Sequence, residues 1–168
     1  MRKRTTLITM IAVFVAIGTI GSQLLWFPTG IAKAFPVQHA INVMAAVTLG
    51  PGPAVIIAFA IGLLRNLLGI GTLLAFPGGM IGALLAGIVF KYTKNKIMAG
   101  IGEVIGTGVI GSLLSVPFAY LLMGTSVGIL AFLPGFLVSS ISGAIIGVLI
   151  LSRVKGSAFS NQTISSKS

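Results

Sequence analysis

Two ionisable side chains lie inside apolar stretches of this sequence and are the first candidates for chemistry. Arg65 follows one long apolar run, and Glu103, the only acidic residue of the 168, lies in another. A charged side chain at the centre of a membrane helix costs at least about 2.5 kcal/mol, so it normally faces a partner or a water-filled cavity. We expect Arg65 to mark a functional site, with snorkelling to the lipid headgroups as the alternative. Glu103 could pair with Arg65, cap backbone groups, act in gating or be protonated.

Neutral polar side chains near Arg65 suggest what such a site would bind. His39 and Asn42 are three residues apart and would share one face of a helix. With Asn66 they offer hydrogen-bond donors and acceptors suited to a small polar heteroaromatic ligand. We expect this set to be too poor in charge for a phosphate or a dicarboxylate. The alternative is that His39 is a satisfied structural residue.

Aromatic residues occur near the same predicted level. Trp26, Phe35 and Phe76 could stack on a heteroaromatic ring, although interfacial aromatics are more often membrane anchors. Thr72 lies in the glycine-rich stretch between Arg65 and Phe76 and completes the candidate site. These residues are expected to converge beside two shortened helices, which strengthens an assignment that each residue alone would not support.

The sequence lacks the residues for several kinds of catalysis. It contains no cysteine and no aspartate, and its single histidine and single glutamate cannot form a dimetal site, a carboxylate dyad or a Ser-His-Asp triad. No glycine-rich stretch ends in lysine followed by serine or threonine, as a phosphate-binding loop for ATP would. We therefore expect no catalytic residues, no metal and no ATP hydrolysis by this chain.

Composition places the protein in a membrane. Hydrophobic residues make up 56% of the chain and charged residues 7%, which is too little charge for the surface of a soluble domain. The net charge of +10 does not indicate nucleic acid, because the basic residues fall in small clusters between apolar runs. The expected fold is an all-α bundle of six transmembrane helices in one domain, residues 1–155, followed by a polar, disordered cytoplasmic tail, residues 156–168.

Six helices of about 20 residues would use the whole membrane domain. A signal peptide is the alternative for the first apolar run, but that run is longer than a usual signal sequence and further spans follow it. The second and third helices are short, so we expect the outer end of the second to stop at a cavity inside the membrane. Pro117 is expected to kink the fifth. The predicted helices are Leu7–Phe27, Val37–Gly50, Ala54–Leu68, a fourth through residues 82–90, Ile97–Met123 and Val127–Leu151.

The basic residues predict an orientation. With both termini inside, nine of the eleven lysines and arginines lie in inner segments, and only Lys33 lies in an outer loop. This asymmetry favours an N-in, C-in topology. It places the stretch 65–80, RNLLGIGTLLAFPGGM, at the outer side, where residues 75–79 are expected to interrupt the entry to the fourth helix.

The sequence resembles the ThiW-type substrate-binding (S) components of energy-coupling factor (ECF) vitamin transporters. The resemblance rests on Pro36–Val43, Leu49–Pro51, Arg65–Gly78 and Gly102–Gly108, and it covers nearly the whole chain except the polar tail. The stretch RN…GxGTxLAFPG is the most specific part.

The resemblance implies a six-helix subunit for uptake of hydroxyethylthiazole, the thiazole precursor of thiamine. Such subunits dock on the coupling subunit EcfT, which two cytoplasmic ATPases accompany, and an AxxxA motif in the first helix makes much of that contact. Here the motif is Ala12–Ala16; the pattern alone would favour internal packing. The alternatives are a stand-alone carrier or pore, or an S component for another vitamin-like heteroaromatic. The expected binding residues are His39, Asn42, Arg65, Asn66, Thr72, Phe76, Trp26 and Glu103.

Overall fold

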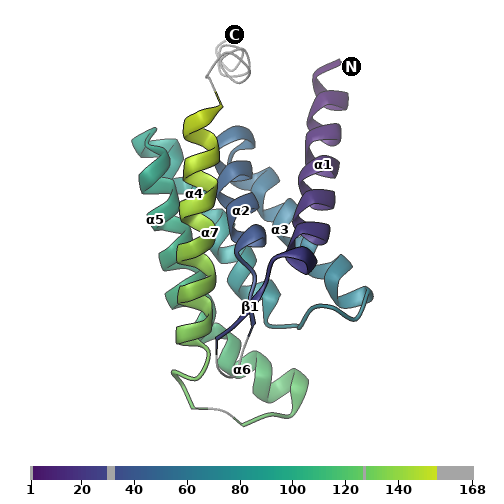
Figure 1. Ribbon diagram of the computed structural model, residues 1–168, viewed down its shortest axis with the longest axis vertical. Coiled ribbons are helices and arrows are strands. Elements are labelled where there is room, and N and C mark those ends of the chain that lie inside the picture. Colours follow the sequence, from purple (N-terminus) through teal and green to yellow (C-terminus); the bar gives the residue numbers. More distant parts are fainter. Residues whose placement is uncertain (1, 30–32, 127, 155–168) are drawn as a thin grey trace.

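The structure is a computed structural model, and it describes residues 2–29, 33–126 and 128–154. It consists of packed helices with one short antiparallel hairpin (Figure 1). The predicted tail, residues 156–168, lies outside the described residues. The elements are α1 (Arg2–Leu24), β1 (Phe27–Pro28), β2 (Lys33–Ala34), α2 (Pro36–Leu49), α3 (Pro51–Leu67), α4 (Ala75–Thr93), α5 (Lys96–Val104), the π-helical segment η1 (Ile105–Gly111), α6 (Ser112–Met123) and α7 (Leu133–Arg153).

The helices confirm an all-α membrane protein. Within the described residues, four helical segments are long and apolar enough to cross a membrane: Arg4–Leu24, Ala75–Thr93, Lys96–Met123 and Leu133–Arg153. The two helices between them are shorter, with 14 residues in α2 and 17 in α3. A rise of about 1.5 Å per residue makes α2 roughly 21 Å long, which is less than the hydrocarbon thickness.

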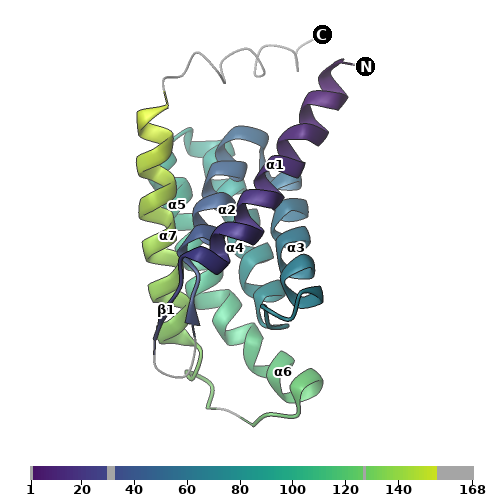
Figure 2. The same ribbon diagram turned by 45° about the vertical axis from the view of Figure 1, so that its right-hand side comes forward.

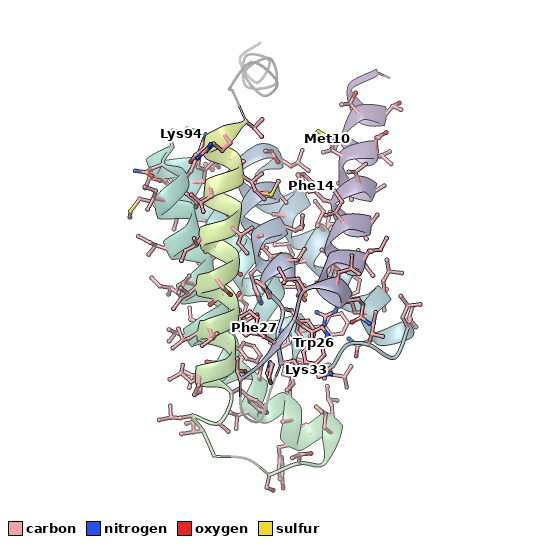
Figure 3. The ribbon with its side chains drawn as sticks, in the orientation of Figure 1. Met10, Phe14, Trp26, Phe27, Lys33 and Lys94 are labelled. Carbon is pink, nitrogen blue, oxygen red and sulfur yellow. The ribbon has the colours of Figure 1, made fainter. Side chains whose placement is uncertain are left out.

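The central helix is α2. It packs against α1, α3, α4, α5 and α7, while α4 packs against α3 on one side and against α5 and η1 on the other. The first residues of α1 and the last of α7 lie at the same end of the bundle, and the hairpin and α6 lie at the opposite end (Figures 1 and 2). The basic residue Lys94 is at the end with the termini, and Lys33 is at the hairpin end (Figure 3).

Small side chains fill the interior, whereas many large apolar side chains are exposed on the outside. Most of the buried cluster is alanine and isoleucine on α2, α3 and α4, and Phe14 of α1 joins it. Ile8, Leu24 and Leu67 are each more than 60% exposed. Small residues inside let helix backbones approach closely, and large apolar residues outside suit contact with lipid.

The segment η1 interrupts the α-helical pattern between α5 and α6. Gly106 and Gly111 pack directly on α4: a Cβ on Gly106 would lie 2.7 Å from the Cα of Gly82. The predicted helix Ile97–Met123 is therefore continuous, but its departure from α-helical geometry begins at Ile105, before Pro117. Single-turn π segments are frequent at functional sites, where they change the direction of side chains.

The structure corrects several predicted helix boundaries. The first and third helices begin earlier than predicted, at Arg2 rather than Leu7 and at Pro51 rather than Ala54. The first helix ends at Leu24 rather than Phe27, because Phe27 and Pro28 pair with Lys33 and Ala34 in the hairpin. Residues 75–79 do not interrupt the fourth helix; they form its first turns, where the missing N–H of Pro77 is tolerated. The last helix begins at Leu133 rather than near residue 127, with its proline in the first turn.

Candidate functional site

A cavity of about 890 Å³ opens at the hairpin end of the bundle. Its walls come from the end of α1, the hairpin, the first turns of α2, the end of α3 with the following link, the start of α4, the end of α6 and the start of α7. Segments from both ends of the sequence therefore enclose it. A volume of this size is in the range of small-molecule binding sites. The short helix α2 begins at this cavity, since Gln38 and His39 line it. A cavity at one end of this helix was predicted; that this end is the outer one and lies within the membrane stays a prediction.

Arg65 lies in the cavity wall and is held by neutral groups. Its side chain is only 1% exposed, so the alternative of snorkelling to headgroups is wrong. The guanidinium donates through Nη1 to Gln38 Oε1 and through Nη2 to the carbonyl of Ile70 at 3.4 Å. It also lies 3.9 Å from the ring centroid of Phe35, within cation–π range.

The link between α3 and α4 forms one side of the cavity. Asn66 Nδ2 donates to the carbonyl of Thr72 at 3.0 Å and to that of Gly62 at 2.8 Å. Gly69 adopts φ of 70°, a left-handed conformation that glycine tolerates best, and it reverses the chain directly after α3. Thr72 lines the cavity, whereas Asn66 does not, so Asn66 positions the link from behind.

A buried polar cluster lies next to the cavity, between α2, α4, α5 and η1. Glu103 Oε1 is 2.7 Å from His39 Nδ1, 2.8 Å from Thr107 Oγ1 and 3.4 Å from Asn42 Nδ2. Asn42 Nδ2 also donates to the carbonyl of Gly79 at 3.1 Å. The alternative that Glu103 pairs with Arg65 is therefore wrong: Glu103 contacts α2 through His39, and Arg65 bonds Gln38 instead.

The predicted binding residues fall into two groups. Trp26, His39, Arg65 and Thr72 line the cavity, with Trp26 and Lys33 together at the hairpin (Figure 3). The other four do not line it. Asn66 supports the link, Phe76 packs 5.6 Å from Phe59 between ring centroids, and Asn42 and Glu103 belong to the buried cluster behind His39.

Several cavity residues were not predicted from the sequence. Gln38 holds Arg65, Lys33 lies 4.2 Å over the ring of Trp26, and Ser139 Oγ accepts from the backbone N–H of Phe35 at 2.8 Å. A polar glutamine beside His39 in a short apolar helix was a usable signal for Gln38. Lys33 was assigned only as a loop charge, and nothing in the sequence pairs Ser139 with the hairpin.

Two further features bear on function. Ala12 and Ala16 are exposed on α1, so the internal packing that their spacing alone favoured is wrong. In the described part of the chain, no three His, Cys, Asp or Glu side chains gather where they could hold a metal ion.

Comparison with known families agrees with this architecture. Residues 8–157 match the model of the ThiW family, described as thiamine-precursor transporter proteins. No curated protein and no solved structure shows significant similarity to the chain. The match covers most of the chain, including every helix that encloses the cavity. The chain therefore belongs to the ThiW family of thiamine-precursor transporters, as its sequence motifs predicted.

Proposed function

We propose that the chain is the membrane-embedded substrate-binding subunit of an ECF-type transporter for a thiazole-type thiamine precursor, with hydroxyethylthiazole as the expected ligand. The observation that carries the proposal is the cavity at the hairpin end, which combines aromatic walls with the polar groups of His39, Arg65 and Gln38. Aromatic and apolar walls with a few placed polar groups are typical of sites for small organic ligands. In this proposal six helices cross the membrane, both termini are inside, and the cavity faces outward.

The interior supports a binding site more than an open pore. Directly behind His39, the side chains of Asn42, Glu103 and Thr107 are at most 1% exposed and bond one another. This cluster joins α2 to α4 and α5, so the polar groups at the cavity are backed by closed protein. A ligand that enters from the hairpin end would thus be retained until the helices rearrange.

In this proposal, partner subunits supply the energy for transport. The sequence has no phosphate-binding loop, so ATP would be used by two partner ATPases and not bound by this chain. Ala12 and Ala16, both exposed, leave a shallow strip along α1 between exposed large residues such as Val13 and Ile17. A strip of small residues permits close approach of another helix, and in this proposal that helix belongs to EcfT.

Two measurements test the proposal. The purified chain should bind hydroxyethylthiazole more tightly than thiamine or the pyrimidine precursor in calorimetry. Cells or vesicles containing only this chain should show no sustained ATP-driven uptake of the ligand. Co-expression of EcfT and the ATPases should produce that uptake. Uphill transport by the chain alone would instead indicate a stand-alone carrier. Tighter binding of an unrelated heteroaromatic would indicate an S component for another vitamin.

A further inference from the structure

We propose that the cavity selects a ligand that carries an anionic group, a phosphomonoester or a carboxylate, and that Arg65 and Lys33 receive that group. The inference rests on the proposed function, in which the ligand contains a thiazole-type ring. It adds that a substituent of this ring is negatively charged. It revises the expectation from sequence that the site is too poor in charge for a phosphate.

Among the residues that the structure describes, two cationic side chains and no acidic one line the cavity. Arg65 and Lys33 both line it. Glu103 is the only acidic residue in the sequence, it does not line the cavity, and its Oε1 already accepts from His39 and Thr107. The positive charge at the cavity is therefore not balanced by a carboxylate of this chain.

Arg65 has unused capacity to donate. The groups that hold it, the amide of Gln38, the carbonyl of Ile70 and the ring of Phe35, are all neutral. Its Nε is buried and has no hydrogen-bond partner within the described residues. A buried guanidinium is most stable when its charge is neutralised and its donors are used. An anionic ligand that reached Arg65 from the cavity would neutralise the charge of the guanidinium and accept hydrogen bonds from it.

Lys33 provides the second cation at the mouth of the same cavity. Its Nζ lies 4.2 Å from the ring centroid of Trp26, and its side chain is exposed. The two cations are thus each held against an aromatic face, which fixes their positions without cancelling their charge. A planar guanidinium and an ammonium in the wall of one cavity suit the oxygens of a phosphomonoester or a carboxylate better than they suit an alcohol.

The cavity also has room for a ring with a charged substituent. Its volume of about 890 Å³ is large for one five-membered ring. The aromatic side chains of Trp26, Phe35 and Phe132 are distributed around it, so a ring can stack while its substituent extends to Arg65. Because Arg65 is buried, attraction between the ligand's charge and its guanidinium is weakened little by solvent.

The test is calorimetric binding of the purified full chain to matched neutral and anionic ligands. The thiazole set is hydroxyethylthiazole, its phosphate monoester and the corresponding thiazole carboxylate; the pyrimidine set is the hydroxymethylpyrimidine precursor and its phosphate monoester. We expect at least one anionic thiazole to bind about tenfold or more tightly than the thiazole alcohol, which matches one charge-assisted hydrogen bond. The phosphate and carboxylate arms identify which anion the site takes.

Variants assign the preference to the two cations. Lys33→Gln and Arg65→Lys should each reduce the ratio of anionic to neutral thiazole affinity, with Arg65→Lys losing the planar fork but keeping the charge. Lys94→Gln removes a cation at the opposite end of the bundle and should leave the ratio unchanged (Figure 3). The exposed position of Lys33 keeps its variant informative if Arg65→Lys does not fold.

The outcomes separate this inference from the proposed function. If the thiazole alcohol binds as tightly as both anionic thiazoles, the inference is overturned and the proposed function stands. If the pyrimidine phosphate binds more tightly than every thiazole, the anionic preference is upheld and the proposed ring is wrong. If none of the ligands binds, both are overturned. An anion preference that survives in Lys33→Gln and in Arg65→Lys overturns the assignment to these residues.

Discussion

His39 Nδ1 and Glu103 Oε1 lie 2.7 Å apart where α2 packs against α5, and only His39 of the two reaches the cavity. A carboxylate accepts hydrogen bonds, so Nδ1 donates to Glu103 and Nε2 is the ring nitrogen available to a ligand. The acidic side chain thus fixes the orientation and the tautomer of the histidine without touching the ligand. Glu103 is therefore a positioning residue in the proposed site.

The first prediction concerns this pair. His39→Ala should weaken ligand affinity by about tenfold, because it removes one hydrogen bond to the ligand. Glu103→Gln should also weaken affinity, because Nδ1 loses its charged acceptor. If Glu103 acts through His39, the double variant should bind no more weakly than His39→Ala alone. Calorimetric Kd values for the wild type and the three variants give the comparison.

Asn42→Ala is the matched control for that prediction. Asn42 bonds the same carboxylate and the Gly79 carbonyl, but it is fully buried and does not line the cavity. Its removal should lower thermal stability, since a buried hydrogen bond is lost, with a smaller change in Kd than His39→Ala. A larger loss of affinity for Asn42→Ala than for His39→Ala would place the ligand deeper, in the polar cluster.

The sequence predicted the helices because their signals are local. The apolar runs, the glycine and proline residues at 50–53 and the basic loop near Lys94 identify segments without knowledge of their packing. The hairpin was not predictable in this way, since two-residue strands such as Phe27–Pro28 have no periodicity to read. The π-helical segment η1 could not be predicted from the sequence either. It lies where Gly106 packs on α4, and the sequence does not show that contact.

Residue types and spacing located the site, but its pairings required the fold. Arg65, His39 and Trp26 were identified because polar or aromatic side chains are conspicuous in apolar sequence, and all three line the cavity. Their partners are separated from them along the chain: Glu103 lies 64 residues from His39. Pairing with Arg65 was one alternative for Glu103 from the sequence, yet helix packing brings Glu103 to His39. Pairings of this kind follow from which helices are neighbours, which one sequence does not state.

The second prediction concerns the link between α3 and α4. Asn66→Asp removes the Nδ2 donor to Thr72 and Gly62 while it keeps the side-chain shape. The link should become less well positioned, and ligand should dissociate faster, by several-fold in stopped-flow measurements. The Leu67→Ala variant is the control, because Leu67 is 74% exposed and does not line the cavity.

A reporter on the same link tests whether it moves. The chain has no cysteine, so Thr72→Cys can be labelled at a single site with an environment-sensitive fluorophore. Ligand should change its emission, whereas the same label at Thr93→Cys, at the end of α4 away from the cavity, should not respond. If saturating ligand leaves the emission of the label at residue 72 unchanged, the link does not move when ligand binds.

The third prediction concerns α1. Ala12→Leu or Ala16→Leu should abolish uptake by the complete transporter while ligand binding by the isolated chain is unchanged, because both alanines are exposed and remote from the cavity lining. Uptake assays with EcfT and the ATPases, paired with calorimetry, separate the two effects. Ile145→Phe adds bulk to an exposed position on α7 and should leave uptake intact. Loss of ligand binding in Ala12→Leu or Ala16→Leu would indicate that these two positions pack within the chain.

The fourth prediction concerns the contact of α4 with η1, which sets the position of Glu103. A Cβ on Gly82 would collide with Thr107 Oγ1 and lie 2.9 Å from Glu103 Oε1. Gly82→Ala should therefore destabilise the folded chain by about 1–3 kcal/mol, the usual cost of overpacking, and displace the carboxylate from His39. Thermal unfolding in detergent should show a lower Tm together with weaker ligand binding. Gly52→Ala is the matched control, since a Cβ there meets no atom within 4 Å, and its Tm should be unchanged or slightly raised. Equal Tm values for the two variants would mean that α4 and η1 are less tightly packed than their glycines indicate.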